Sequence, residues 1–327
     1  MAIEDTQSLT IEVYDVVLTF STNSAKLIKE IRKDFGSFET RAGLETDGRM
    51  RIIETDGKFP LRIPKYAIRD ASVLTSSIFT LSNLRFLEEK EKRILRVDFE
   101  KNEILGYFKP HCEFSMFCPP RFLLKWMLIK ALEKKDIAYI HGSGVERDGS
   151  SLFFVGPTGF GKTHALVTFL LEDYRLITDD TIFFGDERVL PFHLRSNIHR
   201  DMVEKFPVLK RGLSDKSTFV PGPGWLIDLG DIFSVQEKKV QPSKLFYTYV
   251  WNAAETKIEV IPKKEMLSRL FHVYQIELDK SIWFNHNKEE AMRKIFPNYS
   301  ALVQKADCYK VYAGSNPSGF LKTIQAT

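Results

Sequence analysis

The sequence predicts an α/β protein with a strand-rich first third, and three observations support that expectation. Short apolar or alternating segments, separated by turn residues, fill the first third of the chain. Pro119 and Pro120 then precede an amphipathic helical segment. Beyond Ile137 a strand, a glycine-rich loop, a helix and another strand follow one another, which is the order of a βαβ unit.

The first third is predicted to be a β-rich N-terminal region covering residues 1–118. Strands are expected at 11–17, 49–53 and 94–99. Residues 25–35 have the apolar spacing of a helix, and Asp-Gly pairs mark turns. We place the domain boundary at the proline pair, so that residues 119–327 form the second domain.

The second domain is predicted to begin with a helix at 121–135. Its next elements are expected to be a strand at 138–145, a hairpin turn at 147–149, a buried strand at 151–155, a helix at 164–173 and a strand at 174–178. The remaining elements are expected to be strands at 189–192, 257–261 and 309–312 and helices at 197–210 and 289–305.

The composition indicates a globular protein. Hydrophobic residues are 43% of the chain, and 26 Phe are among them, which is ample material for a core. The formal net charge of +4 arises from 47 basic and 43 acidic residues, a balance unlike that of nucleic-acid-binding proteins. No apolar run reaches about 18 residues, and the polar N-terminus is unlike a signal peptide. We therefore expect a cytoplasmic protein with no nucleic-acid or membrane partner.

The cysteines are Cys112, Cys118 and Cys308, an odd and sparse set that argues against a disulfide framework. His111 lies beside Cys112, but the spacing to Cys118 is wide for zinc and a fourth ligand is missing. These residues are expected to be ordinary free thiols in a reducing compartment.

The glycine-rich loop carries the clearest chemical signal. Residues 156–163 fit the pattern G-x-x-x-x-G-K-[ST], with an apolar strand directly before them and a helix directly after. Glycines let successive backbone N–H groups point at one phosphate, and the helix N-terminus adds positive potential at the same place. We expect ATP to bind through Gly156, Pro157, Thr158, Gly159, Phe160, Gly161, Lys162, Thr163 and His164. A chance match in a glycine loop is the alternative, which the flanking strand and helix disfavour.

The last two residues of this pattern have separate expected roles. Lys162 is expected to reach the β- and γ-phosphates and to stabilise charge during phosphoryl transfer. Thr163 is expected to offer its hydroxyl to Mg²⁺. The motif therefore predicts ATP and Mg²⁺ as cofactors.

Asp179 and Asp180 close the strand that follows the loop and its helix. A carboxylate at the end of such a strand is placed to hold magnesium. Since successive strand side chains point in opposite directions, one carboxylate is available to the metal while the other accepts the proton of an attacking hydroxyl. An ordinary polar turn is the alternative interpretation of the pair.

Together, His141, the loop and the paired aspartates soon after Lys162 resemble the catalytic core of HPr kinase/phosphorylase and its relatives. The stretch is more distantly similar to ATP-dependent phosphoenolpyruvate carboxykinase, which has a similar His-x-Ser stretch before its P-loop. The resemblance implies a P-loop kinase core of this type, with Asp179 as general base and Asp180 binding magnesium together with Thr163. It also implies that His141 lies beside the phosphates, whereas the residue alone suggests an ordinary strand histidine.

The chain departs from the HPr kinase pattern in three respects. His164 follows the loop threonine, where HPr kinases carry an acidic residue. The N-terminal third shows no likeness to the HPr kinase N-terminal domain, and the signature loop that accompanies phosphorylase activity is not recognisable. Neither protein HPr as the substrate nor reversal of the reaction by phosphate is therefore implied.

Two further features lie beyond the core. Arg195 is expected to clamp the transferring phosphoryl group, with a solvated basic residue as the alternative. Residues 221–225 mark a loop that either holds the acceptor or packs as a connection.

The leading hypothesis is a kinase that transfers the ATP γ-phosphoryl group to a hydroxyl of a protein or peptide serine or of a small-molecule alcohol. The N-terminal region is expected to help to bind this acceptor. The alternative is a regulatory module that binds nucleotide without turnover or switches on hydrolysis. A carboxykinase-like enzyme is a third hypothesis, but it requires an acid-binding arginine set that we do not find. The sequence also leaves a homo-oligomer open.

Overall fold

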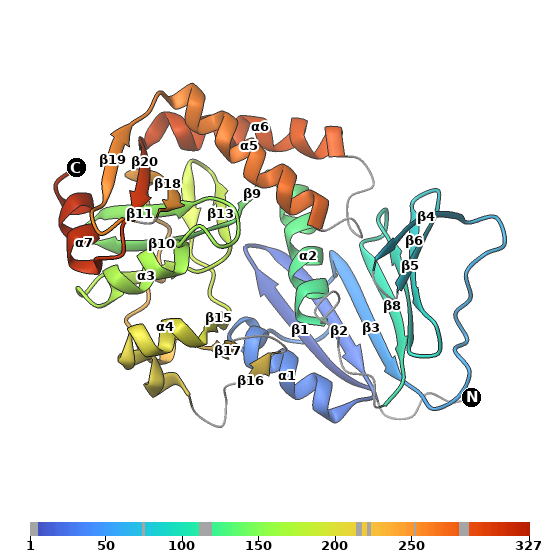
Figure 1. Cartoon of the computed structure of the whole chain (residues 1–327). Helices are drawn as coiled ribbons and strands as arrows, with labels where there is room; N and C mark the ends of the chain where they lie inside the picture. Colours follow the sequence, from blue (N-terminus) through green and yellow to red (C-terminus); the bar gives the residue numbers. More distant parts are fainter. Residues whose placement is uncertain are drawn as a thin grey trace. The chain divides into compact units, whose positions relative to one another are not determined.

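The computed structural model describes residues 6–73, 76–110, 120–213, 218–220, 224–251, 253–280 and 288–327, and it is a mixed α/β protein as expected (Figure 1). His111, Cys112, Cys118 and Pro119 lie outside these ranges, as do residues 221–223 of the expected loop. The chain divides into two compact units, of which the first extends to Lys135 and the second begins at Asp136. The first unit therefore continues beyond residue 118 and includes the helix that follows the proline pair.

The first unit contains an eight-stranded sheet with the order β1-β2-β3-β8-β7-β6-β5-β4. Its strands are β1 (Gln7–Val13), β2 (Val16–Thr22), β3 (Gly48–Glu54), β4 (Ile68–Val73), β5 (Ser76–Leu81), β6 (Leu84–Glu89), β7 (Arg93–Asp98) and β8 (Glu103–Phe108). β3 runs parallel to β2 and β8, and every other pair is antiparallel.

We expected a single strand at 11–17. The structure corrects this expectation, because the chain reverses direction within that segment. Tyr14 and Asp15 have φ angles of 52° and 63°, and Val13 pairs with Val16 across the turn. Two consecutive residues with positive φ are the signature of a tight hairpin connection. Because apolar and polar residues alternate on both sides of the turn, the sequence pattern did not reveal it.

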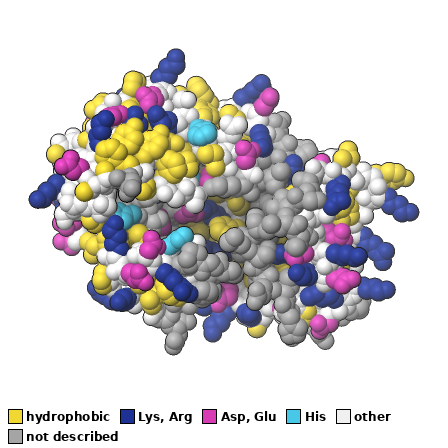
Figure 2. Space-filling model, in the orientation of Figure 1, with side chains coloured by type: hydrophobic (Ala, Val, Ile, Leu, Met, Phe, Trp, Pro, Cys, Tyr) yellow, Lys and Arg dark blue, Asp and Glu magenta, His cyan; other side chains and the backbone are white. Residues whose placement is uncertain are grey.

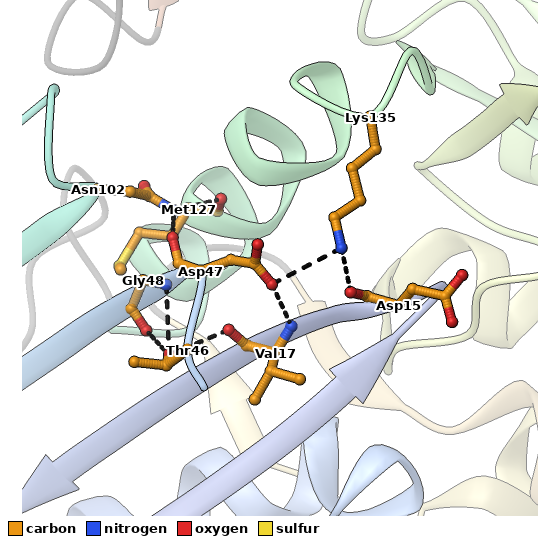
Figure 3. A network of polar contacts seen from close by, with 8 residues as sticks. All are labelled: Asp15, Val17, Thr46, Asp47, Gly48, Asn102, Met127 and Lys135. Carbon is orange, nitrogen blue, oxygen red and sulfur yellow. Dashed lines mark hydrogen bonds and ion pairs between the residues drawn. The ribbon is translucent and has the colours of Figure 1, made fainter. Parts of the chain in front are cut away.

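Two helices of the first unit, α1 (Ala25–Phe35) and α2 (Pro120–Glu133), pack on strands of this sheet. A polar network then fixes the end of α2 to the starts of β2 and β3 (Figure 3). Asp47 Oδ2 accepts a hydrogen bond of 2.8 Å from Val17 N and lies 3.9 Å from Lys135 Nζ. Asn102 Nδ2 donates to the carbonyls of Asp47 and Met127 at 3.1 and 3.3 Å. Because these contacts are internal to the first unit, they explain why α2 belongs to it.

The second unit is built on a six-stranded sheet with the order β12-β10-β11-β18-β20-β19. These strands are β10 (Gly142–Arg147), β11 (Ser150–Val155), β12 (Arg175–Thr178), β18 (Lys244–Val250), β19 (Lys257–Val260) and β20 (Asp307–Ala313). β10 is antiparallel to both β11 and β12, so β11 and β12 run in the same direction with β10 between them. β11, β18 and β20 are parallel, and their carboxyl ends therefore lie at one edge.

Two three-stranded sheets complete the strands of the second unit, with the orders β14-β13-β9 and β15-β17-β16. Their strands are β9 (Ala138–Ile140), β13 (Ile182–Gly185), β14 (Arg188–Leu190), β15 (Ser196–His199), β16 (Thr218–Val220) and β17 (Gly224–Ile227). The strand expected at 138–145 is thus corrected to two, β9 and β10, which belong to different sheets. His141 stands at the break between them.

Helices cover both faces of the six-stranded sheet (Figure 1). The helices of the second unit within the described ranges are α3 (Lys162–Leu170), α4 (Arg200–Lys205), α5 (Lys263–Lys280), α6 (Lys288–Lys305) and α7 (Pro317–Gln325), with 3-10 turns at Pro207–Gly212 and Leu229–Asp231. α3 and α7 share one buried core with Phe154, Phe246 and Val311, whereas α5 contacts β20 from the other side. We expected a helix at 197–210. The structure corrects this expectation, since β15 occupies the first residues of that range. None of the helices within the described ranges is both long and apolar enough to cross a membrane.

Candidate functional site

The loop between β11 and α3 has a backbone that requires glycine. Gly156, Gly159 and Gly161 have φ angles of 150°, 85° and 80°, a region that residues with a Cβ rarely adopt. Gly161 is also the N-cap of α3, and no side chain caps that helix end. The first backbone N–H groups of α3 therefore receive no hydrogen bond from a capping side chain.

Lys162, the first residue of α3, turns back over this loop. Its side chain is buried, and its Nζ donates to the carbonyls of Gly156 and Pro157 at 2.8 Å each. Thr158 and Gly159, at the tip, are exposed. A buried ammonium group therefore lies beside a loop whose tip is exposed to solvent.

Asp179 follows β12, and three hydroxyl groups approach its carboxylate. Ser143 Oγ on β10 donates to Asp179 Oδ1 at 2.7 Å. Thr163 Oγ1 on α3 lies 3.5 Å from the same oxygen, and Ser196 on β15 donates a further hydrogen bond. Elements far apart in the sequence thus meet at Asp179. We did not predict Ser143 or Ser196, although Ser143 belongs to the His-x-Ser stretch.

The surroundings of Asp179 act on its proton affinity in opposite directions. Burial raises the pKa of its carboxyl group above the ordinary value, and the negative charge of Asp180 adds to that increase. Hydrogen bonds from Ser143 and Ser196 and the charge of Lys162 lower the pKa, but burial is the stronger effect. A carboxylate with a raised pKa is better suited to accept a proton than an ordinary aspartate.

Asp180 has different surroundings from its neighbour. Its φ of 67° bends the chain at this point, so the two carboxylates face different environments. His141 Nδ1 lies 3.1 Å from both the backbone O and the Oδ1 of Asp180. The side chain of Asp180 is 49% exposed, whereas His141 is buried and its Nε2 has no hydrogen-bond partner among the described residues.

The structure brings together most of the predicted site residues, but in a different pairing. We expected Thr163 to bind the metal together with Asp180, whereas the carboxylate beside Thr163 is that of Asp179. Asp180 is instead the partner of His141. The catalytic and metal-binding roles of these residues stay predictions.

The oxygen donors beside the loop are few, as a magnesium site that also uses phosphate oxygens requires. Across the described part of the chain, no three His, Cys, Asp or Glu side chains gather in a metal-binding arrangement. Magnesium in nucleotide sites is held by one or two protein oxygens together with phosphate oxygens and water. Thr163 and the paired aspartates fit that smaller requirement.

Two predicted residues lie at the margin of this group. The ring of His164 packs edge-on against Phe206 and Phe320, with centroids 5.1 and 6.5 Å apart. Burial lowers the pKa of His164 to about 4, so its side chain is neutral near pH 7. Arg195 is buried directly before Ser196 and β15. Whether His164 contributes to nucleotide binding and Arg195 clamps phosphate stays a prediction.

The chain shows a distant likeness to solved structures. No protein-family model and no curated protein matches the chain. A solved structure, the Hpr(Ser) kinase/phosphatase from Coxiella burnetii, is 13% identical and covers 43% of this chain and 98% of its own length, with a TM-score of 0.23. This is a distant structural resemblance, and we transfer no ligand, activity or site residue from it.

Proposed function

We propose that this chain is an ATP- and magnesium-dependent kinase that transfers the γ-phosphoryl group to a hydroxyl. The observation that carries the proposal is the convergence of Lys162, Thr163 and Asp179 beside a loop that requires glycine. Positioning and electrostatic stabilisation account for most of the catalysis of phosphoryl transfer. Positioning and electrostatic stabilisation are both supplied by an ammonium group, a hydroxyl and a carboxylate around one loop.

Nucleotide binding is assigned to the loop and to Lys162. The positive φ angles leave backbone N–H groups without a Cβ in the way, and the uncapped start of α3 favours an anion. When nucleotide binds, Lys162 Nζ would exchange the two backbone carbonyls to which it donates for phosphate oxygens. Magnesium, held by Thr163 and a carboxylate, supplies charge neutralisation when it is bound.

Asp179 is the proposed general base. In the transfer, the acceptor O–H loses its proton to the Asp179 carboxylate while the oxygen forms a bond to the γ-phosphorus. The bond between that phosphorus and the bridging oxygen breaks, and ADP leaves. The raised pKa of Asp179 suits this role, and the hydrogen bond from Ser143 holds the carboxylate in place.

The contact between Thr163 and Asp179 also supports the opposite assignment of the pair. In that arrangement Asp179 binds magnesium next to the threonine hydroxyl, and the more exposed Asp180, beside His141, accepts the proton. Both assignments give a kinase. They differ in which aspartate governs the magnesium requirement.

The acceptor is proposed to be a protein or peptide serine or a small-molecule alcohol. Labelled ATP, magnesium and pools of each class are incubated with the protein, and mass spectrometry identifies what gains a phosphate. Transfer that depends on Asp179 supports the kinase. Tight binding of ATP without any transfer would instead support the nucleotide-binding regulatory module.

Binding itself is tested by calorimetry with magnesium-ATP. We expect Lys162→Ala to lose at least ten-fold in affinity, since a buried charge-assisted contact to phosphate is removed. Lys294→Ala, which removes an exposed ammonium group on α6, is the matched control and should bind like the wild type. Equal affinity of all three proteins would remove the nucleotide site.

A further inference from the structure

A cluster of aromatic rings stands beside the glycine-rich loop. We call it the aromatic platform, and its members are Phe160, Tyr247, Tyr249, Trp251 and Tyr312. The ring of Phe160 lies 5.5 Å from that of Tyr249, which stacks at 5.3 Å on Tyr312. Trp251 continues the row at 5.6 Å from Tyr312. Figure 2 shows hydrophobic side chains gathered over the region of β18 and β20.

The aromatic platform is continuous with the loop. Phe160 is itself a loop residue, between two of the glycines with positive φ. Val250, the last residue of β18, comes so close that a Cβ on Gly161 would lie 3.1 Å from its Cγ2. Because β11, β18 and β20 are parallel, the loop and the platform share the carboxyl edge of the sheet, where ligands of open α/β sheets bind.

The strand order sets the direction in which a bound nucleotide extends. Asp179 follows β12, which lies on one side of β11, and the platform stands on β18 and β20 on the other side. The proposed chemistry places the γ-phosphate at the Asp179 end. The ribose and the base then leave the loop toward the opposite side, which is the side of the platform.

The platform is open to solvent and carries paired rather than free cations. Trp251 is 37% exposed, and Phe160 and Tyr312 are half-buried. Lys257 and Lys310, whose ammonium groups lie 5.9 and 5.3 Å from the Tyr312 ring, both form ion pairs with Glu259. Neither of these two lysines therefore offers a free charge to an anion, and the aromatic rings themselves favour a flat ligand.

The Arg269 side chain on α5 is likewise occupied. Its Nη2 forms an ion pair of 2.6 Å with Glu265, and its guanidinium lies 4.9 Å from the Tyr247 ring. The guanidinium also donates to the hydroxyl of Tyr249. These contacts fix two of the rings from the α5 side of the sheet, so that the platform is held in shape before any ligand arrives.

We propose that the aromatic platform binds the nucleobase of the nucleoside triphosphate by stacking. This inference rests on the proposed nucleotide site, and it adds the place and the chemistry of base recognition. Stacking on aromatic side chains contributes strongly to nucleotide affinity because every base presents a π face.

The experiment compares magnesium-ATP with magnesium-tripolyphosphate, which keeps the phosphates and lacks the base. Wild-type protein should bind ATP more tightly. Trp251→Ala should weaken ATP binding by about five-fold to a hundred-fold while leaving tripolyphosphate within about two-fold. Phe296→Ala, which removes an exposed aromatic ring on α6, is the matched control and should change neither affinity.

A second measurement does not depend on the stability of those variants. ATP should quench the fluorescence of the wild-type protein, whereas tripolyphosphate should not. The quenching by ATP should vanish in Trp251→Phe, which keeps a ring at the platform.

The two proposals fail in different ways. ATP and tripolyphosphate binding with equal affinity, both sensitive to Lys162→Ala, would overturn the base site and leave the phosphate site intact. Insensitivity of both ligands to Lys162→Ala would overturn the nucleotide site itself. If Trp251→Ala changes the sedimentation coefficient without changing ATP affinity, the platform is an interface between copies of this chain and the proposal fails.

Discussion

Ser143 shows how a single buried hydroxyl can control a neighbouring carboxylate. Its side chain is fully buried on β10, and its hydrogen bond favours the ionised form of Asp179. In Ser143→Ala the pKa of Asp179 should rise further, because burial remains while a stabilising donor is lost. If Asp179 is the base, transfer requires its carboxylate, and the acidic limb of the pH–rate profile should move to higher pH. On that limb, the rate at a given pH should fall about ten-fold or more.

Ser151→Ala is the matched control for that measurement. Ser151 is also fully buried, on the adjacent strand β11, but its hydroxyl donates to the carbonyl of Gln241. The variant should lose a comparable structural hydrogen bond and keep the position of the acidic limb. An unmoved limb in Ser143→Ala would show that the serine only supports packing.

Replacement of each aspartate separates the base from the metal ligand. Asp179→Asn and Asp180→Asn should both lower phosphoryl transfer, by about a hundred-fold to ten-thousand-fold for the one that is the base. Loss of the base should spare magnesium-ATP binding, whereas loss of the metal carboxylate should raise the magnesium concentration needed. Magnesium titrations of both variants measure this. Wild-type turnover in either variant would mean that this residue only forms the turn.

His164 makes the folding of the second unit sensitive to mild acid. Its pKa is lowered to about 4 by burial first and then by Lys205, with Asp201 opposing, while the ordinary value in an unfolded chain is 6.5. Between these values the unfolded chain binds a proton that the folded chain does not. The free energy of unfolding contributed by this residue is therefore complete above pH 6.5 and is lost as the pH falls toward about 4.

Urea unfolding at several pH values between 7 and about 4 measures that effect. His164→Gln should lose less stability than the wild type over this interval, since the group that titrates is absent. His272→Gln removes an exposed histidine from α5 and should follow the wild type. Identical pH dependence in all three proteins would contradict the buried neutral histidine.

At the scale of elements, the sequence pattern predicted those helices whose formation depends mainly on local sequence. The helices expected at 25–35 and 289–305 agree closely with α1 and α6, because their apolar spacing is continuous. The strand β15 was expected to be helical, and its pairing with β17 lies about thirty residues away in the sequence. Such a partner leaves no trace in a local window, and tertiary pairing overrides propensity there.

The candidate site shows the same difference between features that are local in the sequence and features that depend on distant segments. The glycines, Lys162 and the paired aspartates could be predicted, because a motif and a strand end are local features. Ser143 meets Asp179 only because β10 lies between β11 and β12, an order that no single segment encodes. The strand β18, with its run of aromatic residues, went unassigned although its composition is typical of a strand. The aromatic platform could not be inferred without it.

At the scale of the whole molecule, the division of the chain into two units places α2 with the first. Leu124 and Leu128 of α2 are fully buried, and the helix contacts β2 and β3. A chain that starts at residue 121, near the boundary expected from the proline pair, would expose this apolar surface to solvent. A chain that starts at Asp136 carries none of α2 and follows the observed division.

This contrast gives a prediction about where each activity resides. The protein that starts at Asp136 should be soluble and should bind magnesium-ATP with nearly wild-type affinity, because the loop, β12 and the aromatic platform all belong to the second unit. The protein that starts at residue 121 should express less soluble material, since about 25 cal/mol is lost for each Å² of apolar surface left in water. If the first unit binds the acceptor, the shorter protein should also lose transfer to it while retaining slow ATP hydrolysis. Full transfer by the shorter protein would place acceptor binding in the second unit, and failure of that protein to fold would show that the two units depend on each other.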